Sequence, residues 1–339
     1  MCRKECLAAG TYKLSAERET IMEKLLVTSA EYAKANRAYT DEVVTHYQAE
    51  VIYNTKKGAM DEEALIQTIN AEQITGLLVY SSSDEVTGHV LKSCPTLRAI
   101  SRHGVGMENI DVNTAKSLGM AVVNTSNAHD YEAVADLVLA DMLAIARKVP
   151  AFDKALKGGE WNRIPASNVW GKTLGIIGYG RIGKAVADRA KAFRMKIVAA
   201  SSRGGSIAGL PEDIEEISKE ELLAKSDFVS LHCRLTDETR GLIGEKELRS
   251  MKSSAYLINT GRAGLVDANA LLTAVKEGWI AGAATDVFEK EPTTDDPLIT
   301  AKLDNLLVTP HIGIYTEETL REIDILAMEN LLFALSEQK

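Results

Sequence analysis

The segment LGIIGYGRIGKAVADRA, residues 174–190, constrains the fold more than any other part of the chain. It places Gly178, Gly180 and Gly183 as GxGxxG directly after a short apolar run and at the start of a helical pattern. The glycines serve a tight turn, close approach of the backbone to a pyrophosphate, and close packing of helix on strand. The pattern therefore predicts a dinucleotide-binding turn, with cofactor contacts from Gly178, Gly180, Arg181, Ile182 and Gly183.

Short apolar runs rich in β-branched residues alternate with helical patterns along most of the chain. One series precedes residue 125, and a second begins near residue 172. Such alternation is typical of a parallel sheet with helices on its faces. Because the chain has 339 residues, 45% of them hydrophobic, it is long enough for two cores. The sequence therefore predicts an α/β protein with two doubly wound parallel-sheet domains.

Two long helical patterns join these series. Residues 131–149, YEAVADLVLADMLAIARKV, are apolar on more than one side, and we expect Pro150 to end this helix. Residues 317–335 form an amphipathic pattern that we expect to return to the first domain. The residues before Met22 lack the apolar block of a signal peptide and are expected to be a dispensable leader, with Met22 as an alternative start.

Composition argues against several classes of partner. The net charge is −9, and the basic residues are scattered among acids, so neither a nucleic acid nor a membrane surface is expected. No apolar run is long enough to cross a membrane. The cysteines are too sparse for a disulfide framework, which favours a cytoplasmic location. No metal site is predicted, because the histidines lack ligand spacing. A small soluble ligand is the expected partner.

The stretch KIVAASSRGG, residues 196–205, bears on which dinucleotide is bound. An acid about 20 residues after the glycines holds the ribose of NAD, whereas a nearby arginine accommodates the 2′-phosphate of NADP. Ser201 stands where the acid is expected, and Arg203 can pair with a phosphate with help from the hydroxyls of Ser201 and Ser202. NADP is therefore the expected cofactor. The alternative is NAD, held through other contacts, with Arg203 as a solvated loop residue.

Three later stretches each place a chemically active residue after a predicted strand. Arg262 lies in LINTGRAGLVDANALL, Glu291 in GAATDVFEKEP and His311 in LLVTPHIG. With GYGRIG and SRHGVGMENIDV, these motifs make the chain resemble the D-isomer-specific 2-hydroxyacid dehydrogenase family, which includes phosphoglycerate dehydrogenases and glyoxylate or hydroxypyruvate reductases. The resemblance extends from about Leu25 to the C-terminus.

The resemblance implies a division of labour between the two domains. A flavodoxin-like substrate domain is expected at residues 22–124 and 312–339, and a Rossmann dinucleotide-binding domain at residues 125–311. It also implies an NAD(P)-dependent oxidoreductase that acts on the CH–OH group of a small 2-hydroxy acid, or on the matching 2-keto acid, in a cleft between the domains. A homodimer, formed through the Rossmann unit and its long helix, is a further expectation from the family.

By the same resemblance, Arg262, Glu291 and His311 are the catalytic residues, and their chemistry suits the task. An imidazole with an ordinary pKa of about 6.5 can give a proton to the developing alkoxide and take it back in reverse. Glu291 is expected to orient the ring of His311 and favour its protonated form. Arg262 presents parallel N–H donors for the keto oxygen and the carboxylate.

Further binding residues are carried over from the family. Asp286 is expected beside the nicotinamide carboxamide, and Thr260 and Gly261 at the end of a strand near the cofactor. His232 is expected to pack near the cofactor edge without a catalytic part. In the first domain, the expected substrate contacts are Val105, Gly106 and Ser81.

The chain departs from the family pattern at three places, and two of them, the NTSN loop and Tyr80, bear on the substrate. The segment NTSNAHDYEAVAD stands where many members have NTPG. Arg234 in HCRLT stands where members usually have a proline, and the sequence does not explain this arginine. Tyr80 stands where members acting on phosphoglycerate often have an arginine, so a phosphorylated substrate is disfavoured. Two alternatives stay open: a formate or phosphite dehydrogenase on the same scaffold, and a corepressor-like protein that binds the dinucleotide without turnover.

Overall fold

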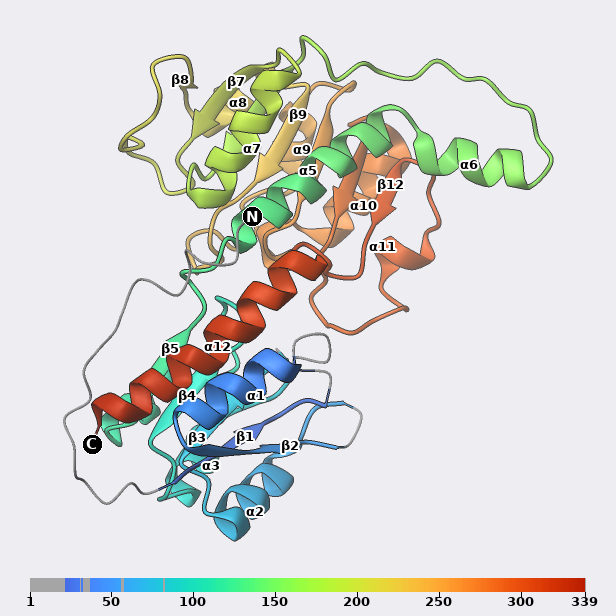
Figure 1. Ribbon diagram of the computed structural model, residues 1–339. Coiled ribbons are helices and arrows are strands. Elements are labelled where there is room, and N and C mark those ends of the chain that lie inside the picture. The colour runs from blue at the N-terminus through green and yellow to red at the C-terminus, as the bar shows by residue number, and fades with distance from the viewer. Residues whose placement is uncertain (1–21, 31, 33–36, 56–57, 82, 339) are drawn as a thin grey trace, which may run out of the picture. The chain divides into compact units, whose positions relative to one another are not determined.

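The computed structural model describes residues 22–30, 32, 37–55, 58–81 and 83–338. The chain forms two compact units, and the described part of unit 1 lies before Ser126 and from Asp324 onward, while unit 2 runs from Ser126 to Ile323. Each unit is a parallel sheet with helices on its faces (Figure 1). The expectation of two doubly wound α/β domains is confirmed. The proposed leader, residues 1–21, lies outside the described residues.

Unit 1 is built on a five-stranded parallel sheet with the order β2-β1-β3-β4-β5. Its strands are β1 (Glu23–Val27), β2 (Ala49–Tyr53), β3 (Gly76–Val79), β4 (Ala99–Arg102) and β5 (Ala121–Asn124). Its helices before β5 are α1 (Arg37–His46), α2 (Glu62–Glu72), α3 (Gly88–Ser93) and α4 (Val112–Ser117). Side-chain oxygens of Asp61, Thr87 and Asp111 accept backbone N–H groups and thereby start α2, α3 and α4.

The last helix, α12 (Glu317–Glu337), completes the core of unit 1. Its residues Met328, Leu331 and Leu335 are buried against Leu25 and Leu78 of the sheet. A glycine at position 76 makes this contact close, because a Cβ there would lie 2.9 Å from Leu335. The C-terminal part of α12 therefore belongs to the fold of unit 1, although the chain reaches it after leaving unit 2.

Unit 2 contains a seven-stranded parallel sheet with the order β12-β11-β10-β9-β6-β7-β8. Its strands are β6 (Thr173–Ile177), β7 (Lys196–Ala200), β8 (Glu215–Glu216), β9 (Phe228–Leu231), β10 (Tyr256–Asn259), β11 (Gly282–Thr285) and β12 (Leu306–Val308). Its helices are α5 (Asp130–Ala146), α6 (Val149–Lys157), α7 (Arg181–Ala192), α8 (Lys219–Lys225), α9 (Glu245–Ser250), α10 (Ala268–Glu277) and α11 (Pro297–Thr300), with a short 3₁₀ turn, η1 (Ala263–Leu265).

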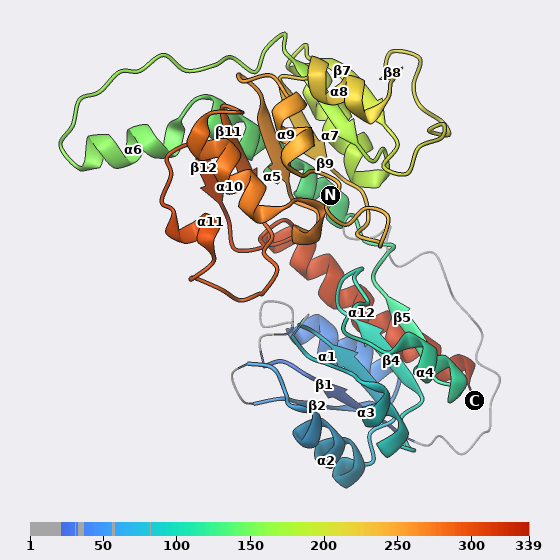
Figure 2. The same cartoon turned by 180° about the vertical axis from the view of Figure 1, so that it is seen from behind.

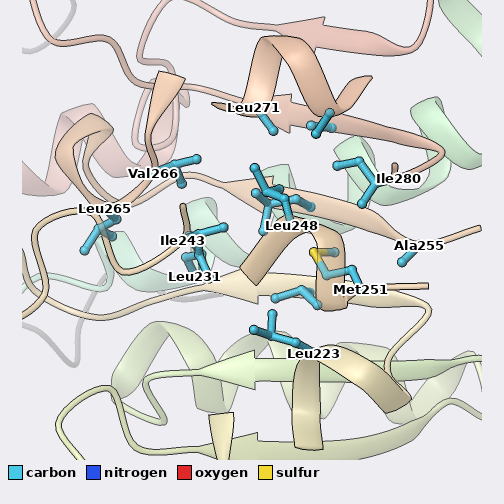
Figure 3. Close-up of a cluster of buried hydrophobic side chains, with 14 of the residues drawn as sticks. Leu223, Leu231, Ile243, Leu248, Met251, Ala255, Leu265, Val266, Leu271 and Ile280 are labelled. Atoms are coloured by element: carbon cyan, nitrogen blue, oxygen red, sulfur yellow. The ribbon is translucent and has the colours of Figure 1, made fainter. Parts of the chain in front are cut away.

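Helices cover both faces of this second sheet. Helices α5 and α7 bury apolar side chains with β6, β7 and β10 on one face (Figure 1). Helices α8, α9 and α10 cover the other face, which is nearer the viewer in Figure 2. Figure 3 shows the core beneath them, where Leu223, Leu248 and Leu271 of these helices meet strand and loop residues such as Leu231 and Ile243. The sheet is thus a rigid base for the loops that leave its strands.

One sequence-based boundary is wrong. Pro150 does not end the long helix, because α5 already ends at Ala146 and Pro150 lies in the first turn of α6. The first turn tolerates proline, since its N–H groups have no partner within the helix. Among the described residues, no helix is both long enough and apolar enough to span a membrane.

Candidate active site

Three neighbouring strands of unit 2 lead to the expected catalytic residues. Arg262 follows β10, Glu291 follows β11 and His311 follows β12. These strands are adjacent in the order β12-β11-β10 and run parallel, so their carboxyl ends share one edge of the sheet. Ligand sites of doubly wound sheets form at this edge. The fold therefore brings the three residues to one place.

His311 and Glu291 form a direct pair. The Nδ1 atom of His311 lies 2.5 Å from Oε2 of Glu291, while Oε1 accepts the backbone N–H of Phe288 at 2.9 Å. Since the carboxylate accepts, Nδ1 carries the proton and Nε2 is left to face a substrate. Burial raises the pKa of Glu291, but hydrogen bonds from His311 and Phe288 and the nearby charge of Arg262 outweigh it and hold the pKa below its ordinary value. The carboxylate thus stays ionised.

The backbone around Arg262 is fixed by Asn259 at the end of β10. The side-chain amide of Asn259 donates to the carbonyl of Arg262 at 3.0 Å, and its oxygen accepts the N–H of Gly261 at 3.1 Å. The guanidinium Nη1 donates to the carbonyl of Gly261 at 2.9 Å. The charge of Arg262 contributes to lowering the pKa of Glu291, so the guanidinium lies near enough to that acid to act on it. Arg262 and the His311–Glu291 pair therefore follow the carboxyl ends of adjacent strands.

Asp286 immediately follows β11 and is completely buried. Its carboxylate accepts three hydrogen bonds, and all three donors belong to the segment that carries His311. The contact of Asp286 with a nicotinamide carboxamide stays a prediction, and the contacts of its carboxylate that the structure shows are with the chain itself. The contact with the His311 segment is one that sequence reasoning missed, since the pattern of the chain does not show which side chains meet across two loops.

The glycine turn fits a dinucleotide on its own geometry. Gly178 has φ 96°, and a Cβ there would lie 2.7 Å from the backbone of Cys233. A Cβ at Gly183 would lie 2.4 Å from the carbonyl oxygen of Gly178, so only glycine lets α7 approach the turn. At Gly180, which precedes α7, a Cβ would meet nothing within 4 Å, and no side chain caps the helix. The start of α7 therefore has no side-chain cap and has space beside Gly180, which suits a bound phosphate.

The other expected cofactor residues differ in whether their side chains already have hydrogen-bond partners within the protein. The hydroxyl of Thr260 is buried and has no hydrogen-bond partner among the described residues, which suits a polar ligand atom. His232 is bonded to Ser230 at 2.8 Å, and burial lowers its pKa to about 3, so its ring is neutral. The guanidinium of Arg181 donates to the carbonyl of Ser126 at 2.6 Å, so this side chain is engaged within unit 2. Ile182, in the first turn of α7, packs against the core on the α5 and α7 face of the sheet.

Ser201, Ser202 and Arg203 follow β7, where the sequence places them. The Ser201 hydroxyl accepts the N–H of Arg203 at 3.4 Å and donates to the carbonyl of Gly204 at 2.9 Å, which folds the loop back on itself. The Arg203 side chain is exposed. Glu238, in the loop after β9, lies close enough for the Arg203 charge to contribute to lowering its pKa. This acid near Arg203 comes from a different loop of the chain, and no local sequence pattern indicates that the two residues are neighbours.

The expected substrate residues lie in unit 1, at the carboxyl ends of the adjacent strands β3 and β4. The N–H of Ser81 donates to Asp84 at 2.9 Å, and the side chain of Asn109 donates to the carbonyl of Ser81 at 3.1 Å. The loop with Val105 and Gly106 begins at Gly104, where φ is 116°. Hydrogen bonds therefore order the chain at Ser81, and a glycine turn starts the loop with Val105 and Gly106.

Two bonds within unit 1 hold the start of the loop that contains Val105. His103 is buried and its Nε2 lies 2.9 Å from Oδ1 of Asp324, while the N–H of Gly104 donates to the Thr125 hydroxyl at 3.0 Å. Thr125 and Asp324 are the residues of unit 1 at which the chain leaves and returns. The loop is thus fixed to both of them, a link that joins residues far apart in sequence.

Comparison with known proteins identifies this arrangement. The model of the D-isomer specific 2-hydroxyacid dehydrogenase NAD binding domain matches residues 139–313, which include the glycine turn and all three expected catalytic residues. The chain belongs to the D-isomer specific 2-hydroxyacid dehydrogenase family. As a member, it is an NAD(P)-dependent oxidoreductase that acts on the CH–OH group of hydroxy acids, and this activity is favoured over the formate, phosphite and corepressor alternatives.

Individual relatives of this dehydrogenase point the same way. The glyoxylate reductase of Thermococcus litoralis is 43% identical over 264 residues, which cover 75% of this chain and 79% of that protein. The D-3-phosphoglycerate dehydrogenase of Methanocaldococcus jannaschii is 41% identical over 80% of this chain but only 51% of its own length. Among solved structures, a glyoxylate reductase from Paecilomyes thermophila has a TM-score of 0.80 at 29% identity, covering 94% of this chain and 97% of that one.

A solved acyclic imino acid reductase in complex with NADPH and D-Arg also resembles the dehydrogenase, with a TM-score of 0.79 at 28% identity over 93% of this chain and 98% of that one. With the family model for an NAD binding domain, it supports NADP or NAD as the cofactor. The open N-terminus of α7 and the unpartnered hydroxyl of Thr260 agree with such a ligand. The cofactor fits the residues that are present.

The dehydrogenase also buries an acid that the sequence did not single out. Asp141 lies on α5, is 3% exposed, and its Oδ2 has no hydrogen-bond partner among the described residues. Burial, with a contribution from the charge of Asp286, raises the pKa of Asp141 to about 7. On an apolar helix, one acid looks like part of a solvated face, which is why its burial was missed.

Asp141→Asn should make the protein more stable above pH 7. The pKa of Asp141 is about 7 in the folded state and about 3.9 in an unfolded chain, so the free energy of unfolding falls as pH rises from about 4 to about 7. Removing this titration should gain on the order of 2–4 kcal/mol at pH 8. Thermal and urea unfolding from pH 4 to pH 8 measure the effect. Asp188→Asn, at an exposed site on α7, is the control, and parallel pH profiles for Asp141→Asn and wild type would contradict the prediction.

Proposed function

We propose that the protein reduces a small 2-keto acid such as glyoxylate to the corresponding 2-hydroxy acid, with NADPH as the preferred cofactor and His311 as the acid. The observation that carries the proposal is the His311–Glu291 pair beside Arg262 at one sheet edge. In this proposal, the substrate domain comprises residues 22–124 and 312–339, and the cofactor domain residues 125–311. The glyoxylate reductases among the relatives support the substrate class.

The chain's own residues perform the proton transfer and the charge stabilisation. When bound, the nicotinamide supplies the hydride that reaches the carbonyl carbon. His311 then gives the proton on Nε2 to the developing alkoxide oxygen, and Glu291, ionised and bonded to Nδ1, stabilises the protonated ring before the transfer. In the oxidative direction the neutral ring removes the same proton. In this proposal, the same pair serves both directions of the reaction.

Arg262 supplies the cation that the reaction requires. Reduction moves negative charge onto the keto oxygen, and the neighbouring carboxylate is already negative. A planar guanidinium can donate hydrogen bonds to the keto oxygen and the carboxylate at once. The bond to the keto oxygen strengthens as negative charge grows on that oxygen. The bonds of Asn259 hold the backbone on either side, so little reorganisation is needed.

The substrate is small and carries no phosphate in this proposal. In this proposal, the substrate domain offers the backbone N–H groups of Val105 and Gly106 and the side chain of Ser81 to its carboxylate. Tyr80, whose ring centroid is 4.5 Å from that of His103, is packed into unit 1, and it offers no cation where a phosphate would need one. The match to a phosphoglycerate dehydrogenase covers only 51% of that enzyme, so it is weaker support for a phosphorylated substrate.

Arg262→Ala should lower kcat/KM for glyoxylate by about 10²–10³-fold, the range for removing a donor to a developing oxyanion. Lysine should restore little, because it lacks the planar fork. A spectrophotometric screen of glyoxylate, hydroxypyruvate, pyruvate and bulkier 2-keto acids with NADPH measures the rates. Arg249→Ala, on α9 before the amino end of β10, is the matched control. Wild-type rates for Arg262→Ala with every acid would overturn the proposed site.

The preference for NADPH rests on the loop after β7. This loop offers Arg203 and the hydroxyls of Ser201 and Ser202, and it holds no acid where NAD-binding members have one. Glu238 reduces the net positive charge there, but a phosphate can still pair with the exposed guanidinium. The phosphate is thereby recognised by charge and by planar donors.

Arg203→Ala should raise the KM for NADPH roughly tenfold or more, the loss expected for a charged hydrogen bond, and leave the KM for NADH nearly unchanged. Initial rates with both cofactors at saturating keto acid measure it. Lys196→Ala removes a positive charge from the amino end of the same strand and is the control. A wild-type enzyme that prefers NADH would show that Arg203 does not set the choice.

We also propose that the protein forms a homodimer through α6 and the segment after it. These residues expose a row of large apolar side chains that no part of unit 2 covers: Val149, Leu156, Trp161, Ile164 and Trp170. Figure 1 shows α6 and the following loop extending away from the sheet of unit 2. Exposed apolar groups gathered on one segment are typical of an interface, and a second copy offers the same surface.

Leu156→Glu combined with Trp161→Glu should convert the dimer to a monomer, because each charge would be buried at the contact. Light scattering after size-exclusion chromatography at micromolar protein measures the mass. Phe333→Glu, an exposed apolar position on α12 of the other unit, is the control and should leave the mass unchanged. A monomeric wild type would refute this interface.

The proposed location is the cytoplasm, without a nucleic-acid or membrane partner. Cys94 and Cys233 are free thiols in the described part of the chain, as a reducing compartment requires. The net charge of −9 disfavours polyanions and anionic lipid surfaces.

A further inference from the structure

His311 sits on a backbone that needs outside support. Its φ is 53°, in the left-handed region that residues with a Cβ rarely adopt. Holding such a residue costs about 1 kcal/mol or more, so surrounding contacts must fix it. Within its own segment, the N–H of His311 donates to the carbonyl of Thr309 at 3.0 Å, which closes a tight turn. One such bond does not determine where the imidazole points.

The carboxylate of Asp286 supplies the missing support from the neighbouring strand end. Its Oδ1 accepts the Thr309 hydroxyl at 2.6 Å and the N–H of Ile312 at 2.8 Å, and its Oδ2 accepts the N–H of Gly313 at 2.8 Å. These donors lie on both sides of His311 in sequence. One buried group therefore holds the turn before and after the residue that it presents.

The surroundings of Asp286 make this attachment rigid. The residue is 0% exposed, and its own N–H donates to the carbonyl of Asn259, the residue that also orders the Arg262 loop. Gly313 leaves room for the contact, since a Cβ there would lie 3.3 Å from Oδ2. Burial raises the pKa of Asp286, while the three donors and the charge of His311 oppose that rise. All partners donate, so the deprotonated acid matches them.

We propose that Asp286 is a positioning residue for the acid–base step: by holding Thr309, Ile312 and Gly313, it keeps the His311 ring against Glu291 with Nε2 free. This role rests on the proposed function of His311. It goes beyond a contact with the cofactor, because both carboxylate oxygens are engaged with the chain itself. An amide cannot replace the acid, since one end would turn an N–H₂ group toward an N–H or O–H donor.

Asp286→Asn should lower kcat by roughly 10- to 100-fold, as expected when a catalytic group moves by about an ångström. The KM for glyoxylate and the Kd for NADPH, from fluorescence titration, should stay within about threefold, since the variant misplaces the acid and leaves binding intact. A cofactor Kd that rises tenfold or more with an unchanged kcat would overturn the proposal. Circular dichroism and thermal melting establish that the variant folds.

Thr309→Val gives a second, milder variant in case Asp286→Asn does not fold. It removes one of the three donors and should lower kcat by about three- to tenfold with unchanged KM, whereas Thr309→Ser keeps the hydroxyl and should restore the rate. Thr114→Val is the matched control, because the Thr114 hydroxyl also donates to an aspartate, Asp111, at 2.7 Å but in unit 1. Equal losses of rate in Thr309→Val and Thr114→Val would contradict the proposal.

A double-mutant cycle separates this proposal from the proposed function. If Asp286 acts through His311, Asp286→Asn should add nothing to the loss caused by His311→Gln. A further tenfold loss in the double variant would show an independent role and refute positioning. If His311→Gln alone keeps the wild-type rate, the proposed function fails. If that variant loses rate but Asp286→Asn does not, only the positioning role fails.

Discussion

The parallel pairing of β10, β11 and β12 is the constraint on which the site depends. Strands that run in one direction end at one edge, so a residue a few positions beyond each strand reaches the same region. Arg262, Glu291 and His311 come from three separate loops and need no long insertion to meet. The apolar clusters on both faces of the sheet fix the strand ends, and short polar contacts then orient each loop.

Buried polar groups do this orienting work in both units. In unit 2, Asn259 ties the Arg262 loop and receives the backbone bond of Asp286, which in turn holds the His311 turn. In unit 1, His103 and Gly104 bond to Asp324 and Thr125. Such groups are costly unless satisfied, and here each is satisfied by a functional loop. The same hydrogen bonds therefore satisfy buried polar groups and orient the loops of the site.

Short apolar runs in the sequence predict most of the strands, whereas contacts between residues far apart in the chain could not be predicted. The apolar runs expected from the sequence all correspond to strands, because buried parallel strands read as continuous apolar stretches. The exposed strand Glu215–Glu216 has no such pattern and was missed. A proline such as Pro150 fits both the end of a helix and the first turn of the next one, so the sequence alone does not distinguish the two.

The candidate site divides in the same way. The family resemblance implied that Arg262, Glu291 and His311 act together, and the 2.5 Å contact between His311 and Glu291 joins two of them. Nothing in the chain's local pattern indicates that Glu238 lies near Arg203, that Asp141 is buried, or that Asp286 holds the turn of His311. These facts depend on which loops are neighbours in space, and a single sequence does not contain that information.

Arg181 has two jobs that differ in nature. Its backbone opens α7 directly after the glycine turn, while its guanidinium, lying 5.4 Å from the Tyr131 ring, is bonded to the carbonyl of Ser126, where unit 2 begins. Replacing the glycine turn by that of another dehydrogenase, in order to alter cofactor choice, would therefore also remove the hydrogen bond from Arg181 that holds the first residue of the unit. Protein engineers who wish to change one property here should graft the turn and its linker together.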